Sequence, residues 1–230
     1  MKPWMETPQI RVRATLVTMT VAAMALPQDE PLPEEDRFVV THGVDWKTYC
    51  AVRELFDSPG LRMTYLKGEL ELMSPSRKHE GYKTRIARLI EMHAIECDVP
   101  LSGYGSTTFR KSLEERGLEP DECYVVGRDL TDDDYPDIAL EVVLKSGGIN
   151  KLEVYRGLGV REVWFWQKQR FMIYRLGESR YELCQRSDFL PGLDFEALAQ
   201  YVEAPDQHSA LKSIATHCGC GRSLDRQLRS

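Results

Sequence analysis

The segment Ile138-Ala-Leu-Glu-Val-Val-Leu144 places one acidic residue in the middle of an apolar run. Such a run predicts a buried β-strand. A carboxylate taken out of water costs several kcal/mol unless something pairs with it. Glu141 is therefore either an outward-facing residue of a half-exposed strand, which is the commoner case, or a buried functional carboxylate. Alternation along the strand puts Asp137 on the same face as Glu141.

A second acidic residue precedes another strand-like segment. Pro120-Asp121 leads into Tyr124-Val-Val126, although Pro-Asp is also an ordinary turn pair. Lys151 follows Glu141 on a short helical pattern. Two carboxylates on neighbouring strands with a lysine nearby are suited to hold a hard divalent cation and to polarise a water molecule beside it. The combination, more than either acid alone, favours a metal site built from Asp121 and Glu141.

The expected elements indicate an α/β or α+β fold with a mixed sheet flanked by helices. The chain of 230 residues, 42% hydrophobic and 29% charged, is typical of a globular α/β protein. We expect helices at 45–56, from Ser74 or Ser76 to Cys97, at 150–159 and at 195–202. We expect a hairpin over 63–73 that turns at Lys67-Gly68, and strands at 103–109, 123–126, 138–144, 163–166, 171–175 and 181–184.

Both ends of the chain lie outside the domain that we expect at residues 38–203. Residues 1–37 are interpreted as a leader and linker. Their segment Ala14–Leu26 resembles the apolar part of a signal peptide, but we favour a disordered leader or a true start at Met19 or Met24 over secretion. Residues 204–230 are expected to be a polar tail without periodicity. Its His217-Cys218-Gly-Cys220 motif lacks the second ligand pair of a recognised zinc site.

Composition excludes some classes of protein. A net charge of −6 argues against a broad basic surface that coats nucleic acid, but not against an enzyme that meets DNA through a local groove. The six cysteines are scattered, which suits free thiols in a reducing cytoplasm. No apolar run reaches the roughly 18 residues of a membrane span. Walker, Rossmann and nucleophile-elbow motifs are also missing from the sequence.

Lys151 is expected on the apolar face of its helix, since Val154, Tyr155 and Leu158 follow it at helical spacing. Its ammonium group either reaches back to water along its apolar stem or points toward the Asp121 and Glu141 site. In the second case it would orient the attacking water or stabilise charge that develops on a phosphate.

Three further side chains are weaker candidates: Glu69, His79 and Glu80. Glu69 alternates with Glu71 on the expected hairpin, and we expect one of the two to face away from the core, without a prediction of which. His79 and Glu80 open the long helix and are interpreted either as groups near the metal or as ordinary residues of a helix start, where acids interact with the helix dipole.

Several segments together resemble a known family. They are Gly68–Pro75, His79-Glu80, Glu119-Pro-Asp121, Pro136–Val143 and Lys151–Tyr155 running into Gly159–Trp164. In this order they are similar to the Uma-two family of restriction endonucleases, within the PD-(D/E)XK nuclease superfamily, over about residues 38 to 203.

The resemblance implies a central mixed sheet flanked by helices. It also implies that Asp121 and Glu141 are the metal-binding acids and that Glu69 is an early acidic site residue. Asp137, which shares a face with Glu141, is a candidate for a supporting role next to the metal. The superfamily lysine often stands two residues beyond the second acid. That position is Val143 here, so the resemblance assigns the lysine role to Lys151.

The function expected from this resemblance is a Mg²⁺- or Mn²⁺-dependent endonuclease that acts on DNA in the cytoplasm, with Asp121, Glu141, Lys151 and Glu69 as catalytic residues. A homodimer would help such an enzyme to cut both strands. The alternative is a catalytically inactive protein of the same fold that serves as a binding or interaction module. The acidic balance and the lack of a recognisable DNA-reading appendage motivate that alternative.

Overall fold

The computed structural model describes residues 33–56, 60–132, 134–145 and 147–217. These residues form two compact units. The five-stranded unit contains the chain up to Glu80, Thr108–Glu119 and Lys145–Leu158, and the six-stranded unit contains Gly81–Thr107, Pro120–Leu144 and the chain from Gly159 onward. The leader at 1–32 and the cysteines of the His217-Cys218-Gly-Cys220 motif lie outside the described residues.

The five-stranded unit is built on an antiparallel sheet. Its strands, in spatial order, are β1 (Arg37–His42), β3 (Glu69–Ser74), β2 (Arg62–Leu66), β6 (Arg116–Leu118) and β5 (Phe109–Lys111), with a 3₁₀ turn, η1, at Ser112–Glu114. Lys67 has φ of +44° and Gly68 has φ of +95°. Two consecutive left-handed residues are what a two-residue hairpin turn requires, so the predicted turn at Lys67-Gly68 is confirmed.

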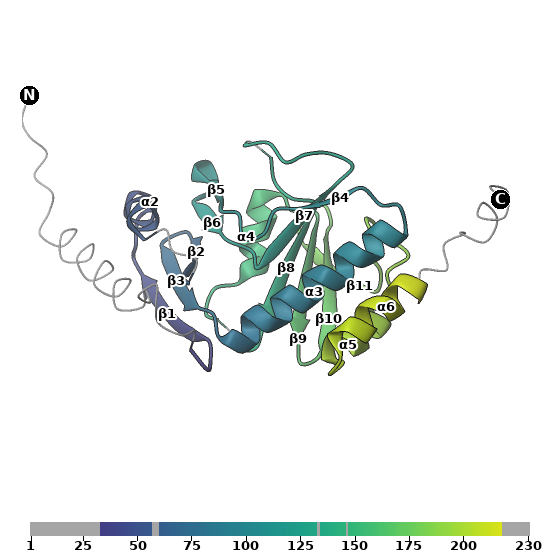
Figure 1. Ribbon diagram of the computed structural model, residues 1–230. Coiled ribbons are helices and arrows are strands. Elements are labelled where there is room, and N and C mark those ends of the chain that lie inside the picture. The colour runs from purple at the N-terminus through teal and green to yellow at the C-terminus, as the bar shows by residue number, and fades with distance from the viewer. Residues whose placement is uncertain (1–32, 57–59, 133, 146, 218–230) are drawn as a thin grey trace, which may run out of the picture. The chain divides into compact units, whose positions relative to one another are not determined.

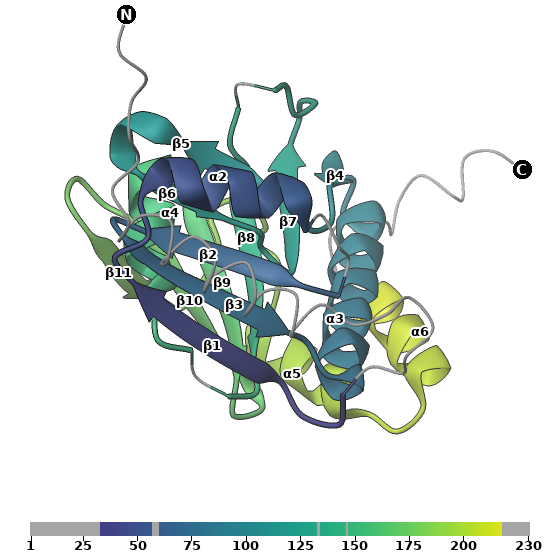
Figure 2. The same cartoon turned by 90° about the vertical axis from the view of Figure 1, so that its left-hand side faces the viewer.

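Helix α2 (Trp46–Leu55) packs against one face of this sheet (Figure 2). The helix begins after Asp45, whose carboxylate accepts a hydrogen bond from the Thr48 amide at 2.7 Å. This side-chain cap satisfies one of the free amides of the first turn. Tyr49 of α2 stacks on Tyr65 of β2, with ring centroids 4.7 Å apart. The ring stack anchors the helix to the sheet.

Helix α4 (Lys151–Leu158) covers the opposite face and contacts β2, β5 and β6. Successive residues of β6 show the two-sided arrangement. A Cβ added to Gly117 would collide with the side chain of Tyr49 on α2, whereas the neighbouring Arg116 lies directly against Gly157 of α4. Because side chains alternate between the faces of a strand, α2 and α4 must lie on different sides of the sheet.

The six-stranded unit contains a mixed sheet (Figure 1). Its strands, in spatial order, are β11 (Tyr181–Cys184), β10 (Arg170–Leu176), β9 (Glu162–Gln167), β8 (Ile138–Val143), β7 (Glu122–Val126) and β4 (Leu101–Gly103). Only β8 and β9 pair in parallel; the other neighbouring strands are antiparallel. The parallel pair is joined by a long connection that includes α4, as parallel pairing requires.

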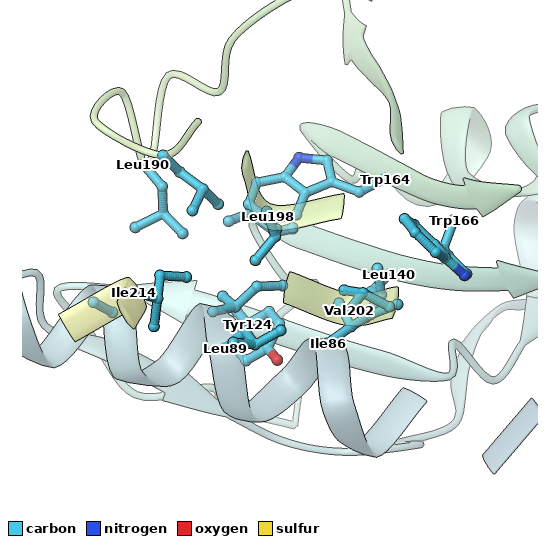
Figure 3. Close-up of a cluster of buried hydrophobic side chains, with 14 of the residues drawn as sticks. Ile86, Leu89, Tyr124, Leu140, Trp164, Trp166, Leu190, Leu198, Val202 and Ile214 are labelled. Atoms are coloured by element: carbon cyan, nitrogen blue, oxygen red, sulfur yellow. The ribbon is translucent and has the colours of Figure 1, made fainter. Parts of the chain in front are cut away.

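Three helices contribute to the core on one face of the mixed sheet: α3 (Arg77–Glu96), α5 (Phe195–Glu203) and α6 (Gln207–His217). Helix α3 begins in the five-stranded unit and continues into the six-stranded unit from Gly81. Figure 3 shows Ile86 and Leu89 of α3 in one buried cluster with Leu140 of β8 and Trp164 of β9. Burial of these large apolar side chains stabilises the unit.

The structure confirms the mixed α and β class, with differences in detail. The segment 103–109 is not one strand, since β4 ends at Gly103 and β5 begins at Phe109 in the other sheet. The lead-in before residue 38 enters β1, which was not predicted. The expectation of no periodic segment after residue 203 is wrong, because α6 buries Ala210 and Ile214 in the core of the six-stranded unit. Two buried residues in an 11-residue helix are too few to give a helical pattern that can be recognised in the sequence.

Candidate active site

Asp121 lies directly before β7 and beside Glu141 of the adjacent strand β8. The β7–β8 ladder begins at Glu122, which pairs with Leu140, and continues with Cys123 opposite Ala139. The amide of Asp121 donates a hydrogen bond to the Leu140 carbonyl at 3.1 Å, one position off that register. Its carboxylate accepts a hydrogen bond from the Val142 amide, so the contacts of Asp121 reach both residues that flank Glu141.

Both carboxylates are buried, with Asp121 exposing 2% and Glu141 exposing 0% of its surface. Glu141 points to the sheet face opposite to α3, α5 and α6, since the flanking Leu140 and Val142 belong to the core beneath those helices. The amide of Val142 donates a hydrogen bond to Oδ2 of Asp121 at 2.7 Å. The sequence left open whether Glu141 is an outward-facing residue of a half-exposed strand or a buried carboxylate. The structure shows that it is buried.

Hydrogen bonds to Gly105 and Ser106 hold the backbone at the start of β7 in place. Oε1 of Glu122 accepts hydrogen bonds from the Gly105 amide at 2.5 Å and from the Cys123 amide at 3.1 Å. Ser106 donates to the carbonyl of Asp121 at 3.3 Å and accepts from Lys83 at 3.2 Å. Burial is the main cause that raises the pKa of Glu122 above its ordinary value. The contacts fix the backbone on which Asp121 stands.

Asp137 is tied to other parts of the six-stranded unit. Its carboxylate accepts hydrogen bonds from the Val126 amide at 2.9 Å and from the Arg128 guanidinium at 3.2 Å. Asp137 and Glu141 share a face, but they stand four residues apart, which is roughly 13 Å along a strand. The contacts of Asp137 hold the connection between β7 and β8 together, and a role close to the metal stays a prediction.

Lys151, Glu69, His79 and Glu80 belong to the five-stranded unit, whereas Asp121, Glu141 and Asp137 belong to the six-stranded unit. The assembly of all these residues into one site therefore stays a prediction. Lys151 is the first residue of α4 and is half-buried. Three residues that follow it at helical spacing are buried, as the sequence predicts: Val154, Tyr155 and Leu158.

The prediction that Glu69 and Glu71 face opposite ways is wrong. The two residues are separated by one position on β3, opposite Leu66 and Thr64 of β2, and therefore point to the same face. They differ in depth. Glu69, beside the turn, has a side chain 45% exposed and bonded to His42, whereas Glu71 is 2% exposed. Alternation alone could not distinguish them, because residues two positions apart on a strand share a face.

His79 and Glu80 each have a charged partner in the five-stranded unit. Nδ1 of the buried His79 lies 3.2 Å from a carboxylate oxygen of Asp36, and Glu80 lies 3.6 Å from Arg62. Burial raises the pKa of Asp36, but hydrogen bonds from His79 and from the Ser76 amide outweigh this effect and leave the pKa below its ordinary value. The sequence gives no sign of the Asp36 contact, because 43 residues separate the partners.

The donor atoms of the candidate site suit a hard cation. Among the residues that the structure describes, no group of three or more histidine, cysteine or acidic side chains is arranged to bind a metal. A Mg²⁺ ion needs fewer protein ligands, since it is typically bound by one or two carboxylates and keeps several of its own water molecules. The Asp121 and Glu141 pair meets that requirement, whereas a zinc site with four protein ligands finds no support in the described part of the chain.

Comparison with known proteins identifies a family. The family model Uma2, described as putative restriction endonuclease, matches residues 46–203. The matched range contains all the candidate site residues described above and agrees at its end with the resemblance seen over about 38 to 203. No curated protein matches the chain. Within the described residues, no helix combines the length and apolarity that crossing a lipid bilayer requires.

Proposed function

The chain belongs to the Uma2 family of putative restriction endonucleases, and from this premise we propose that it is a metal-dependent endonuclease that hydrolyses phosphodiester bonds of DNA. The observation that supports the proposal is that two buried carboxylates, Asp121 and Glu141, lie side by side. A buried carboxylate loses hydration. A divalent cation coordinated by both residues would offset this cost, so the pair is suited to bind a cation.

The roles of the protein groups follow from their positions. Asp121 and Glu141 would hold Mg²⁺ or Mn²⁺ through carboxylate oxygens, with Asp121 oriented by the Val142 amide. A bound cation would make water a better nucleophile and would neutralise charge on the phosphate. The water oxygen would form a bond to phosphorus while one P–O ester bond breaks. The water would give up a proton and the departing sugar oxygen would take one up, so the products are a phosphate monoester and a free hydroxyl group. Lys151 would orient the water or stabilise the charge that develops on the phosphate.

Glu69, His79 and Glu80 have supporting roles in the proposal. Glu69 would contribute the early acidic group that the family resemblance implies, although in this structure it is half-exposed beside His42. His79 and Glu80 would support the site from the start of α3.

The four described cysteines are free thiols: Cys50, Cys97, Cys123 and Cys184. A cytoplasmic location stays a prediction.

The first test is cleavage of supercoiled plasmid DNA with Mg²⁺ or Mn²⁺. Glu141→Gln and Asp121→Asn remove one negative charge each with little change in shape, and we expect both to lose at least about 100-fold in cleavage rate. Chelation of the metal should have the same effect. Glu182→Gln, an exposed residue of β11 in the same sheet, is the matched control and should cleave like the native protein.

A second readout separates an enzyme from an inactive binding module. Calorimetric titration with Mn²⁺ should show binding to the native protein and to Glu182→Gln, and none to Glu141→Gln. Native protein that binds Mn²⁺ through Glu141 but leaves plasmid intact would direct the search to other DNA or RNA substrates. Native protein that neither binds metal nor cleaves would overturn the proposal in favour of the interaction module.

A further inference from the structure

Glu71 connects the sheet of the five-stranded unit to the loop that precedes α4. Its Oε2 accepts hydrogen bonds from the amides of Gly148 and Ile149, at 2.5 and 3.1 Å. Glu71 stands in the middle of β3, which is paired on both sides, with Val40 of β1 and Thr64 of β2. The carboxylate is therefore held on a rigid strand, and it binds two consecutive amides of the loop.

Two glycines allow this close approach. A Cβ added to Gly147 would overlap the Glu71 carboxylate, and a Cβ added to Gly148 would come within 2.8 Å of Cγ2 of Val40. Real Cβ atoms are essentially never found so close to another heavy atom. The Gly147-Gly148 pair is thus matched to the buried carboxylate, which indicates that the loop is built to lie against Glu71.

The residues that follow lead directly to Lys151. Ile149 is buried, and Oδ1 of Asn150 accepts a hydrogen bond from the Leu152 amide at 3.1 Å. Asn150 thereby caps the helix, and Lys151 is its first residue. Two sets of hydrogen bonds therefore hold the backbone just before Lys151. Glu71 binds the amides of Gly148 and Ile149, and Asn150 caps the helix.

We propose that Glu71 is a positioning residue for Lys151. This inference rests on the proposed function, in which Lys151 acts on the water or the phosphate. Glu71 does not touch the reacting atoms in this proposal; it fixes the start of α4, from which the lysine extends. Displacement of a catalytic group by about 1 Å can lower a rate about 100-fold, so a loose loop would reduce turnover without removing any catalytic side chain.

The experiment compares Glu71→Ala with Glu71→Gln. The Ala variant loses both acceptor contacts, and we expect kcat for plasmid cleavage to fall about 10- to 100-fold. KM and the Mn²⁺ affinity should change less than about threefold, because the metal-binding acids are untouched. The Gln variant keeps one acceptor oxygen and should recover part of the lost rate. Glu54→Gln, an exposed residue of α2, is the control and should leave all values unchanged.

A double variant tests whether Glu71 acts through the lysine. If it does, Glu71→Ala added to Lys151→Met should cause no further loss of kcat, since residues that act as one unit are not additive. Gly147→Ala should reproduce the effect of Glu71→Ala, while Gly81→Ala, where an added Cβ meets no atom within 4 Å, should not. Additive losses in the double variant would overturn the proposal.

Two measurements apply even if native protein cleaves no plasmid. Hydrogen exchange at the amides of Gly148 and Ile149 should be slow in native protein and at least about tenfold faster in Glu71→Ala. Amine-specific labelling of Lys151 should change rate in Glu71→Ala, while labelling of the exposed Lys47 should not. Unchanged exchange and unchanged Lys151 labelling would refute the positioning role. Absence of cleavage by native protein would count against the proposed function alone.

Discussion

The carboxylate of Asp121 accepts a hydrogen bond from the amide of Val142, with 2.7 Å between Oδ2 and the nitrogen. Val142 directly follows Glu141, so this contact fixes one acid of the candidate site to the strand that carries the other. The buried amide of Val142 needs a hydrogen-bond acceptor, and a bound metal cation needs a negatively charged ligand. Asp121 can serve as both. Substitutions that remove the acceptor and substitutions that remove only the charge should therefore have different effects.

Replacement of Asp121 by alanine should destabilise the protein, whereas replacement by asparagine should mainly affect metal binding. Asp121→Ala leaves the Val142 amide without this acceptor, and we expect the free energy of unfolding to fall by about 1–3 kcal/mol. Asp121→Asn keeps a carbonyl oxygen, so we expect a smaller loss. Urea denaturation measures the first effect and calorimetric Mn²⁺ titration the second. An Asn variant that binds Mn²⁺ like native protein would contradict the assignment of Asp121 as a ligand.

The hydroxyl group of Tyr49 should contribute little to stability. Tyr49 is fully buried, and its hydroxyl oxygen has no hydrogen-bond partner among the described residues. Burial raises the pKa of this phenol well above its ordinary value. Tyr49→Phe should therefore leave the free energy of unfolding unchanged or raise it by up to about 1 kcal/mol.

The ring of Tyr49, by contrast, is part of the packing between α2 and Tyr65. Tyr49→Ala should lower the free energy of unfolding by about 3–5 kcal/mol, the range found for removal of large core aromatics. Chemical denaturation of the two variants side by side checks both values. A Phe variant as unstable as the Ala variant would show that the hydroxyl makes a contact of its own.

The turn between β9 and β10 should be improved by glycine. Lys168 and Gln169 both have positive φ, at +52° and +59°, where residues with a Cβ are strained. We expect Gln169→Gly to raise the free energy of unfolding by about 0.5–1 kcal/mol. Gly68→Ala, at φ +95°, is the opposite test and should destabilise by about 1 kcal/mol or more. Thermal denaturation should show melting temperatures that move in opposite directions.

The contact between Asp36 and His79 should make stability depend on pH at the acid end. The pKa of folded Asp36 lies below its ordinary value of 3.8. The unfolded state therefore binds the proton more readily, and the stabilisation is present above about pH 3.8 and lost as the pH falls through the folded pKa. The difference in unfolding free energy between native protein and Asp36→Asn should shrink between about pH 5 and pH 2. A difference that stays constant over that range would refute the assignment.

Local patterns predicted the elements that the candidate site stands on. A continuous apolar run indicated β8, helical spacing indicated α3 and α4, and the Lys67-Gly68 pair indicated the turn between β2 and β3. These features succeed because apolar runs, side-chain periodicity and turn geometry depend on residues that are close in the sequence. The acid in β8 could be recognised for the same reason, since one charged residue in an apolar strand needs an explanation.

The tertiary structure decided which of these residues meet. Asp121 lies beside Glu141 because β7 pairs with β8, and this pairing depends on two strands that the sequence shows only separately. Glu71 rather than Glu69 is buried because the loop at Gly148 and Ile149 lies against Glu71, whereas Glu69 stands beside the turn. The helix α6 was missed because its burial comes from contact with the rest of the six-stranded unit. The sequence by itself therefore determined the local elements and the chemical types at the site, whereas burial and pairing were decided by long-range contacts between strands and helices.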